Sequence, residues 1–326
     1  MTRNRALVLA AAVIYVVLPL RVSDHWLSVL NLAAIAAVGA YGLNLLTGTC
    51  GQLSLGHAAF LGAGAYTAAV VGGPLPVWLG AAALVGALVG LAAGPLAVRV
   101  KGHTVAIVTL ALVFVGQHVF RRWTWFTGGN AGRSDLPSPA LPGTHDQGWF
   151  WLAWALVAVV AWLVANVMRS RSGRAMAAVR TSERAAAVMG VDVARTKVAA
   201  FVASGALAGA AGALYGSYRG YVGPQEWGLL VSVQYLAMVL IGGLGTLRGP
   251  VLGALFVTAL PHAVDAVLDA GPSALVTEAQ VTQLLFGVSI VAVVLVRARR
   301  RPRAAVLSGP AGPHVTGPAA PEVNTG

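Results

Sequence analysis

Apolar runs long enough to cross a lipid bilayer recur along the whole of this 326-residue chain. A helix needs about 20 predominantly apolar residues to span the hydrocarbon core of a membrane. Hydrophobic residues make up 57% of the chain and charged residues only 10%, whereas a soluble domain carries roughly 25% charged residues to keep its surface wet. We therefore predict an all-α, polytopic membrane protein.

Ten apolar runs can be delimited, and they allow about 8–10 transmembrane helices, because some runs could instead form re-entrant segments. The first run follows basic residues as in a signal peptide, but no cleavage site follows it, so we interpret it as an uncleaved span. The runs lie near residues 6–20, 27–47, 55–71, 76–98, 103–120, 149–168, 198–218, 229–246, 250–267 and 279–296.

Basic and acidic residues are segregated along the chain, whose net charge is +12. Arginines and lysine concentrate in 169–197 and again in 297–303. Basic residues beside apolar spans favour a role in membrane orientation over nucleic-acid binding, and by the positive-inside rule both stretches are cytoplasmic. With ten crossings both termini are then cytoplasmic and 121–148 is external, although Arg121, Arg122 and Arg133 do not fit the rule.

Two glycine-rich clusters interrupt the apolar runs, at 48–54 and at 242–250. Non-helical backbone at membrane depth is tolerated only against protein or a water-filled cavity. The clusters could mark equivalent points of two related halves, but their match is too weak to define a repeat. Just after the first, Gly56, Gly62 and Gly64 give a smooth helix face, which fits either a pore-lining break or plain small-residue packing.

The basic stretch contains a run of good helix formers from Arg174 to Met189, and Gly190 stands where a C-cap glycine belongs. We predict one short amphipathic helix, on which Arg180 and Arg184 share a face and Glu183 is exposed. Such a helix fits docking onto another protein or lying on an anionic membrane surface. Near an external span end, Tyr218, Tyr221 and Trp227 favour an interfacial belt over a binding site.

The stretches Leu43–Tyr66, Lys101–Leu110 and Thr127–Gly132 strongly resemble the membrane subunits of branched-chain amino acid ABC importers. The last two are similar to the signature of the M-type permease, the LivM family. Residues 174–215 and 242–254 resemble the cytoplasmic loop and glycine turn of the same family. The resemblance covers about residues 40–255 and leaves out the first span and the C-terminal tail.

The resemblance implies a permease subunit in a bacterial cytoplasmic membrane. Its expected partners are a homologous permease subunit, two ATP-binding subunits, an external substrate-binding protein and the surrounding lipids, with no nucleic acid. Residues 1–297 would form the permease domain, and 298–326, rich in Pro, Gly and Ala, a disordered tail.

The resemblance also implies site residues. Glu183-Arg184-Ala185-Ala186 followed by Gly190 looks like the EAA motif that docks onto the ATPase, although Arg184 stands where the motif often has alanine. The expected ATPase-coupling residues are Arg180, Glu183, Arg184, Ala185, Ala186 and Gly190. Polar residues near the membrane centre are expected to line the substrate path, with hydrogen bonding within the protein as the alternative role at each of them: Asn44, Gln52, Ser54, His57, Thr104 and Thr109.

Neither lysine of the chain ends a phosphate-binding loop, and no metalloprotease or serine-hydrolase motif occurs, so we expect no enzyme activity, cofactor or metal here. Residues 53–71 and 105–120 contain no charged side chain, which favours a small neutral aliphatic amino acid as the substrate. A permease for urea or short amides is the first alternative. An intramembrane hydrolase using Ser54 and His57 and an ion-coupled carrier are more remote alternatives.

Overall fold

The computed structural model describes residues 15–100, 104–268 and 287–288, and within these ranges its regular structure is helical. The long helices are α2 (Asp24–Leu43), α3 (His57–Val71), α4 (Leu75–Arg99), α5 (Thr104–Arg122), α7 (His145–Arg169), α10 (Val193–Arg219), α11 (Leu229–Gly242) and α12 (Gly249–Leu268). The short ones are the π-helix η1 (Asn44–Thr49), α6 (Thr124–Thr127), η2 (Gly129–Ala131), α8 (Arg171–Thr181), α9 (Glu183–Val188) and η3 (Pro224–Trp227).

Apolar helices account for eight of the ten predicted runs. Five are long and apolar enough to cross a membrane, namely α2 with η1, α4, α5, α7 and α10. The apolar parts of α3, α11 and α12 are shorter. The prediction of an all-α, polytopic membrane protein is confirmed. Most of the run 6–20, almost all of 279–296 and the predicted tail 298–326 lie outside the described residues.

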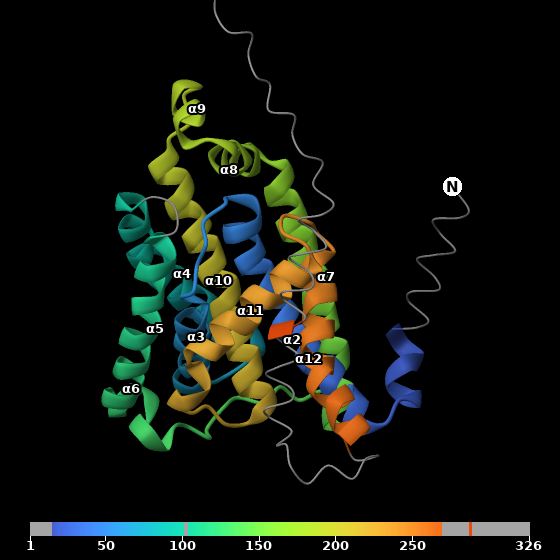
Figure 1. Cartoon of the computed structure of the whole chain (residues 1–326). Coiled ribbons are helices and arrows are strands. Elements are labelled where there is room, and N and C mark those ends of the chain that lie inside the picture. The colour runs from blue at the N-terminus through green and yellow to red at the C-terminus, as the bar shows by residue number, and fades with distance from the viewer. Residues whose placement is uncertain (1–14, 101–103, 269–286, 289–326) are drawn as a thin grey trace, which may run out of the picture.

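The two ends of the bundle differ in structure and charge. Helices α8 and α9 project from one end, whereas α6 and the connections on either side of η3 lie at the other (Figure 1). At that second end Arg133 and Val222 exchange two backbone hydrogen bonds of 2.9 Å, which join the α6–α7 connection to the α10–α11 connection. The basic stretch 169–197 thus lies opposite Asp135, Asp146 and Glu226.

Helices α4 and α10 pack with their backbones in direct contact. They run antiparallel, and Gly86 faces Gly205 in the middle of the contact. A Cβ atom built on either residue would lie 2.2 Å from the carbonyl oxygen of the other. On its next face α10 approaches α3 as closely, at Gly212 against Leu61. Small residues allow this close approach. Helices in lipid associate largely through such packing, because lipid tails are as apolar as the side chains and no hydrophobic effect favours contact between helices.

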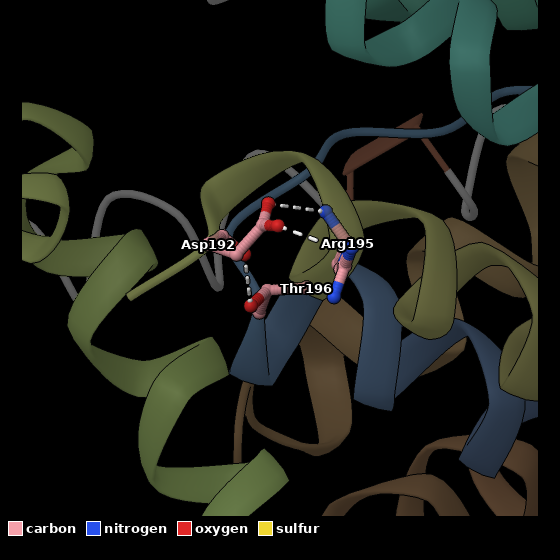
Figure 2. Close-up of polar contacts among 3 residues, drawn as sticks. All are labelled: Asp192, Arg195 and Thr196. Atoms are coloured by element: carbon pink, nitrogen blue, oxygen red, sulfur yellow. Dashed lines mark hydrogen bonds and ion pairs between the residues drawn. The ribbon is translucent and has the colours of Figure 1, made fainter. Parts of the chain in front are cut away.

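Helix α10 leads from the α8–α9 end back into the bundle, and Asp192 is its N-cap (Figure 2). Its carboxylate accepts the backbone N–H of Arg195 at 3.0 Å, and its carbonyl accepts the hydroxyl of Thr196 at 2.7 Å. The Arg195 side chain also pairs with it at 3.1 Å, but both side chains are largely exposed. The cap, worth about 1 kcal/mol, therefore matters more here than the ion pair.

The α4–α10 contact should not tolerate a methyl group. Gly86→Ala forces the two backbones apart, and we expect a loss of about 1–3 kcal/mol of stability. Gly80→Ala on the same helix is the matched control, since nothing lies within 4 Å of its Cβ position. Thermal unfolding of the purified protein in detergent compares them, and equal midpoints for the two variants would contradict this packing.

Candidate functional site

The two glycine-rich interruptions lie against each other at the end of the bundle nearest α8. Asn44, in η1, donates from Nδ2 to the Thr246 carbonyl at 2.9 Å and accepts at Oδ1 from the Gly245 N–H at 2.8 Å. Tyr41 donates its hydroxyl hydrogen to the Leu247 carbonyl at 2.8 Å. The α2–α3 break (residues 50–56) and the α11–α12 turn (residues 243–248) are thereby joined by side chains of α2 and η1.

Arg180 connects α8 to this junction. Its guanidinium donates to the Gly48 carbonyl in η1 and lies beside Gly245, whose φ of +73° suits a residue without a side chain. A hollow of about 210 Å³, lined by residues of α8, η1 and the α11–α12 turn, separates the rest of α8 from the breaks. Arg180 is thus a direct link between α8 and the interrupted helices.

The predicted single helix over 174–189 is wrong, because the chain breaks at Ser182. This residue is extended, with φ of −161°, and its hydroxyl accepts from the Ala185 N–H at 3.3 Å, as an N-cap does. Two helices result, α8 and α9, so Arg180 and Arg184 do not share a helix face. Gly190 ends α9 at φ +83°, in the C-terminal role that the sequence predicts for it.

Glu183 is not the freely exposed acid that the sequence predicts. Its carboxylate lies 2.7 Å from the Lys197 ammonium, and the Lys197 side chain is only 2% exposed. Lys197 stands in the first turns of α10, so this ion pair fastens α9 to the bundle. A buried ammonium needs such a partner, because its desolvation is otherwise uncompensated.

The opposite side of α9 is uncovered. Ala186 is buried against the neighbouring helices, whereas Arg184 and Ala185 are exposed. Val188 and Met189 are 90% and 82% exposed, more than any other large apolar residue of the described chain. Because α9 is the outermost helix at its end of the molecule (Figure 1), these two side chains form an apolar tip.

Three of the predicted pathway residues hold backbone in place. Asn44 joins the two breaks, as described above. Thr109 of α5 accepts from the Leu55 N–H at 2.9 Å and donates to the Ala106 carbonyl at 3.1 Å, and Ser54 accepts from the Gly56 N–H at 3.3 Å. Thr109 therefore fastens segment 50–56 to α5, and Ser54 closes a local turn just before α3, which favours the alternative of hydrogen bonding within the protein.

The other three are not brought to one surface. His57 is fully buried, with Nε2 at 3.0 Å from the Gly39 carbonyl and its ring 4.9 Å from that of Tyr235. Its Nδ1 has no partner, so it forms no dyad with Ser54, and nothing supports the hydrolase alternative. Gln52 is buried, and Thr104 is exposed at the start of α5.

A hollow between the helices was not expected from the sequence. A cavity of about 290 Å³ lies between α2, α3, α10, α11, α12 and η3, and Glu226 is the acid that lines it. Trp227, expected in an interfacial belt, is 3% exposed and lines the same cavity, and Tyr218 is also buried; Tyr221 alone is exposed. In the sequence, the one signal of this cavity was an acidic residue, Glu226, in the short connection between two predicted spans. In the part of the chain that the structure describes, no three His, Cys, Asp or Glu side chains gather as metal ligands would.

Comparison with known proteins identifies the class of this bundle. Residues 26–294 match the family described as "Branched-chain amino acid transport system / permease component". The chain belongs to this permease family. It is therefore a multi-pass membrane subunit of the ABC transporter class, a transporter component that catalyses no reaction itself.

Several bacterial proteins are similar to the chain. The permease protein LivM of a high-affinity branched-chain amino acid transport system is 30% identical in Salmonella typhimurium over 282 residues, 77% of this chain and 66% of that protein. LivM of Escherichia coli is 30% identical over 78% of this chain and 67% of its own length. The chain thus spans about two thirds of the length of these relatives.

A second kind of relative carries a different name. The autoinducer 2 import system permease protein LsrC of Klebsiella pneumoniae is 33% identical over 183 residues, 53% of this chain and 51% of that protein. No solved structure matches the chain significantly.

The Glu183–Lys197 pair should respond unequally to loss of either partner. Removing one member of a buried pair costs about 3–5 kcal/mol, and we expect Glu183→Ala to approach this loss because it leaves a buried ammonium unpaired. Lys197→Met should cost less, since Glu183 stays about a third exposed to water. Thermal unfolding in detergent measures both. The double variant should recover part of the Glu183→Ala loss, and strictly additive losses would contradict the pairing.

Proposed function

We propose that this chain is the permease subunit of an ATP-driven importer for branched-chain, aliphatic neutral amino acids. The extent of the likeness to LivM carries this proposal, since it covers 282 residues. The LsrC likeness covers 183 residues and favours autoinducer 2 as a second candidate solute. Urea or a short amide is a third, because the absence of charge in α3 and in most of α5 suits any small neutral solute.

We infer that the α8–α9 end is cytoplasmic. The arginines of 169–197 gather there, as the positive-inside rule requires, and the acids of the opposite end then face outward together with Arg121, Arg122 and Arg133, which do not fit the rule. On this orientation residues 1–297 form the permease domain, and the family match, which ends at residue 294, supports that boundary. We propose that residues 298–326 form a cytoplasmic tail.

We assign the docking of an ATP-binding subunit to the apolar tip of α9. Exposed apolar side chains on a water-facing element mark an interaction surface, and Val188 and Met189 are the most exposed ones here. Arg184 and Ala185 flank the tip, whereas Glu183 and Ala186 hold α9 to the bundle from its buried side. Glu183, Ala186 and Gly190 would thus support the surface, with Arg184 and Ala185 able to touch the partner.

Transmission into the membrane would run through Arg180. When ATP binding closes the two ATPases, α9 and α8 move with them, and the Arg180–Gly48 hydrogen bond carries this motion to the junction of the two breaks. Broken helices packed on each other have few regular hydrogen bonds to lose when they shift. The loaded external binding protein would deliver the solute to the other end, and a homologous permease subunit would complete the path.

Orientation can be tested by chemical labelling of intact cells. Arg184→Cys on α9 and Asp135→Cys in the α6–α7 connection both place a thiol at an exposed position, and the native Cys50 is buried. We expect an impermeant maleimide to label Asp135→Cys and to reach Arg184→Cys only after the cells are opened. Labelling of Arg184→Cys from outside would reverse the proposed topology.

Uptake by the reconstituted complex tests the substrate. The chain, its partner permease, ATPases and binding protein are placed in liposomes with internal ATP, and labelled solutes are offered outside. Leucine, isoleucine and valine should be imported in competition with one another, and glutamate and lysine should compete weakly. Import of urea or autoinducer 2 without import of leucine would replace the proposal with one of its rivals.

Coupling can be separated from docking by two kinds of variant. Val188→Glu places a charge in the apolar tip and should weaken copurification of the ATPases, whereas Ala194→Glu, exposed in the first turn of α10, should not. Arg180→Ala should leave the complex assembled but raise the ATP consumed per leucine imported, because the link to the breaks is cut. Arg171→Ala on the same helix is its control. An unchanged ratio in Arg180→Ala would exclude this route of transmission.

A further inference from the structure

The cavity beside η3 is enclosed on several sides by aliphatic side chains. Leu32 and Ile35 of α2, Leu61 of α3, Val231 and Met238 of α11 and Val257 of α12 are among the residues that line it. Its volume of about 290 Å³ is close to the lower end of the roughly 300–1,000 Å³ of small-molecule pockets. The cavity therefore suits a small, mainly apolar solute.

The cavity is lined by one carboxylate, Glu226, and one imidazole, His262 of α12. Neither lysine nor arginine is among its lining residues. Gln234 and Tyr235 of α11 add neutral polar groups to the wall. A positively charged group is accordingly favoured beside Glu226, and an anionic group is disfavoured there.

Glu226 retains capacity for a ligand. One of its carboxylate oxygens accepts the Gly223 N–H at a long 3.4 Å. Burial raises the pKa of the Glu226 carboxyl, and the Gly223 N–H and the nearby charge of Arg219 partly oppose this rise. Within the described residues no cation lies within ion-pair distance of Glu226, since the two ion pairs of this part of the chain are elsewhere. A half-buried carboxylate with one weak hydrogen bond gains from a cationic partner.

The cavity lies at the end of the bundle that the proposed topology places outside. It is lined by η3, in the α10–α11 connection, which is joined to the α6–α7 connection by the Arg133–Val222 bridge. Helices α11 and α12, which also line it, continue to the turn that contacts Asn44 and Arg180. A solute in the cavity would thus stand outside the junction of the two breaks.

We propose that this cavity is the outer subsite of the import path, in which Glu226 accepts the ammonium group of an aliphatic amino acid and the surrounding helices hold its side chain. The inference rests on the proposed function and adds a selectivity to it. An acidic amino acid would be repelled by Glu226, and a solute without an ammonium group, such as urea, would gain nothing from it.

Leucine uptake by the reconstituted complex, with its own binding protein, tests this subsite. Glu226→Gln keeps the shape of the side chain and removes its charge. We expect the KM for leucine to rise about tenfold, the loss of one charge-assisted hydrogen bond. Asp135→Asn, an exposed acid at the same end, is the control and should leave the KM unchanged. A wild-type KM in Glu226→Gln, measured while the wild-type complex imports leucine, overturns the subsite and leaves the proposed function standing.

A second pair of variants tests the cavity without touching its charge. Val231→Trp places a large ring in the cavity from α11, whereas Val233→Trp, two residues along, adds the same ring at an exposed position outside it. Val231→Trp should lose most leucine uptake in complexes that still assemble, and Val233→Trp should not. Equal uptake by both variants overturns the inference, also where Glu226→Gln proves unstable. Failure of the wild-type complex to import leucine would instead remove the proposed function.

Discussion

Backbone peptide groups that leave a helix inside a membrane need partners within the protein, because lipid offers none. Among the described residues, two glycine-rich interruptions between apolar helices, 50–56 and 243–248, lie near each other, because Gly48, just before the first, contacts Gly245 in the second. Asn44 supplies a donor and an acceptor to the second interruption, Tyr41 supplies a donor to it, and Arg180 supplies one to Gly48 just before the first. The second break is thus held by side chains of α2 and η1, and the first is held by Thr109 of α5 and by Ser54.

The remainder of the bundle brings these breaks together. Glycine-to-glycine contact between α4 and α10, and between α10 and α3, lets three backbones approach closely, so that packing replaces the missing hydrophobic effect. Helix α2 is almost wholly buried, and its π-helical end widens the backbone where Asn44 turns toward the second break. A tightly packed frame thus surrounds one region of irregular backbone, to which α8 has direct access.

The sequence predicts the helices well, because hydrophobicity is a local property that can be counted along the chain. All eight apolar runs within the described residues became helices, and Gly190 ends α9 as expected. The break at Ser182 was missed because good helix formers surround it, and a capping hydroxyl competed successfully with them. The roles of the predicted coupling and pathway residues stay predictions.

Side-chain partners across the fold were beyond the reach of sequence reasoning. Nothing near Glu183 in the chain indicates Lys197, and the polar character of Ser54 and Thr109 does not reveal whether they face a solute or a peptide group. The cavity beside η3 lies between α2 and α3, early in the chain, and the consecutive elements α10, η3, α11 and α12, so that only the packing of these two parts defines it. The sequence alone therefore identifies the class of protein more readily than its side-chain contacts and its cavities.

The hydrogen bonds between Asn44 and the α11–α12 turn can form only late in the synthesis of the chain. The partners of Asn44 lie 201 and 202 residues further along the chain, and at about 5–20 residues per second this stretch takes roughly 10–40 s to synthesise. During that interval the amide of Asn44 is already in or near the membrane without its final partners. The nascent bundle must therefore shelter one polar side chain, through water, the insertion machinery or a temporary contact, until α11 and α12 are made.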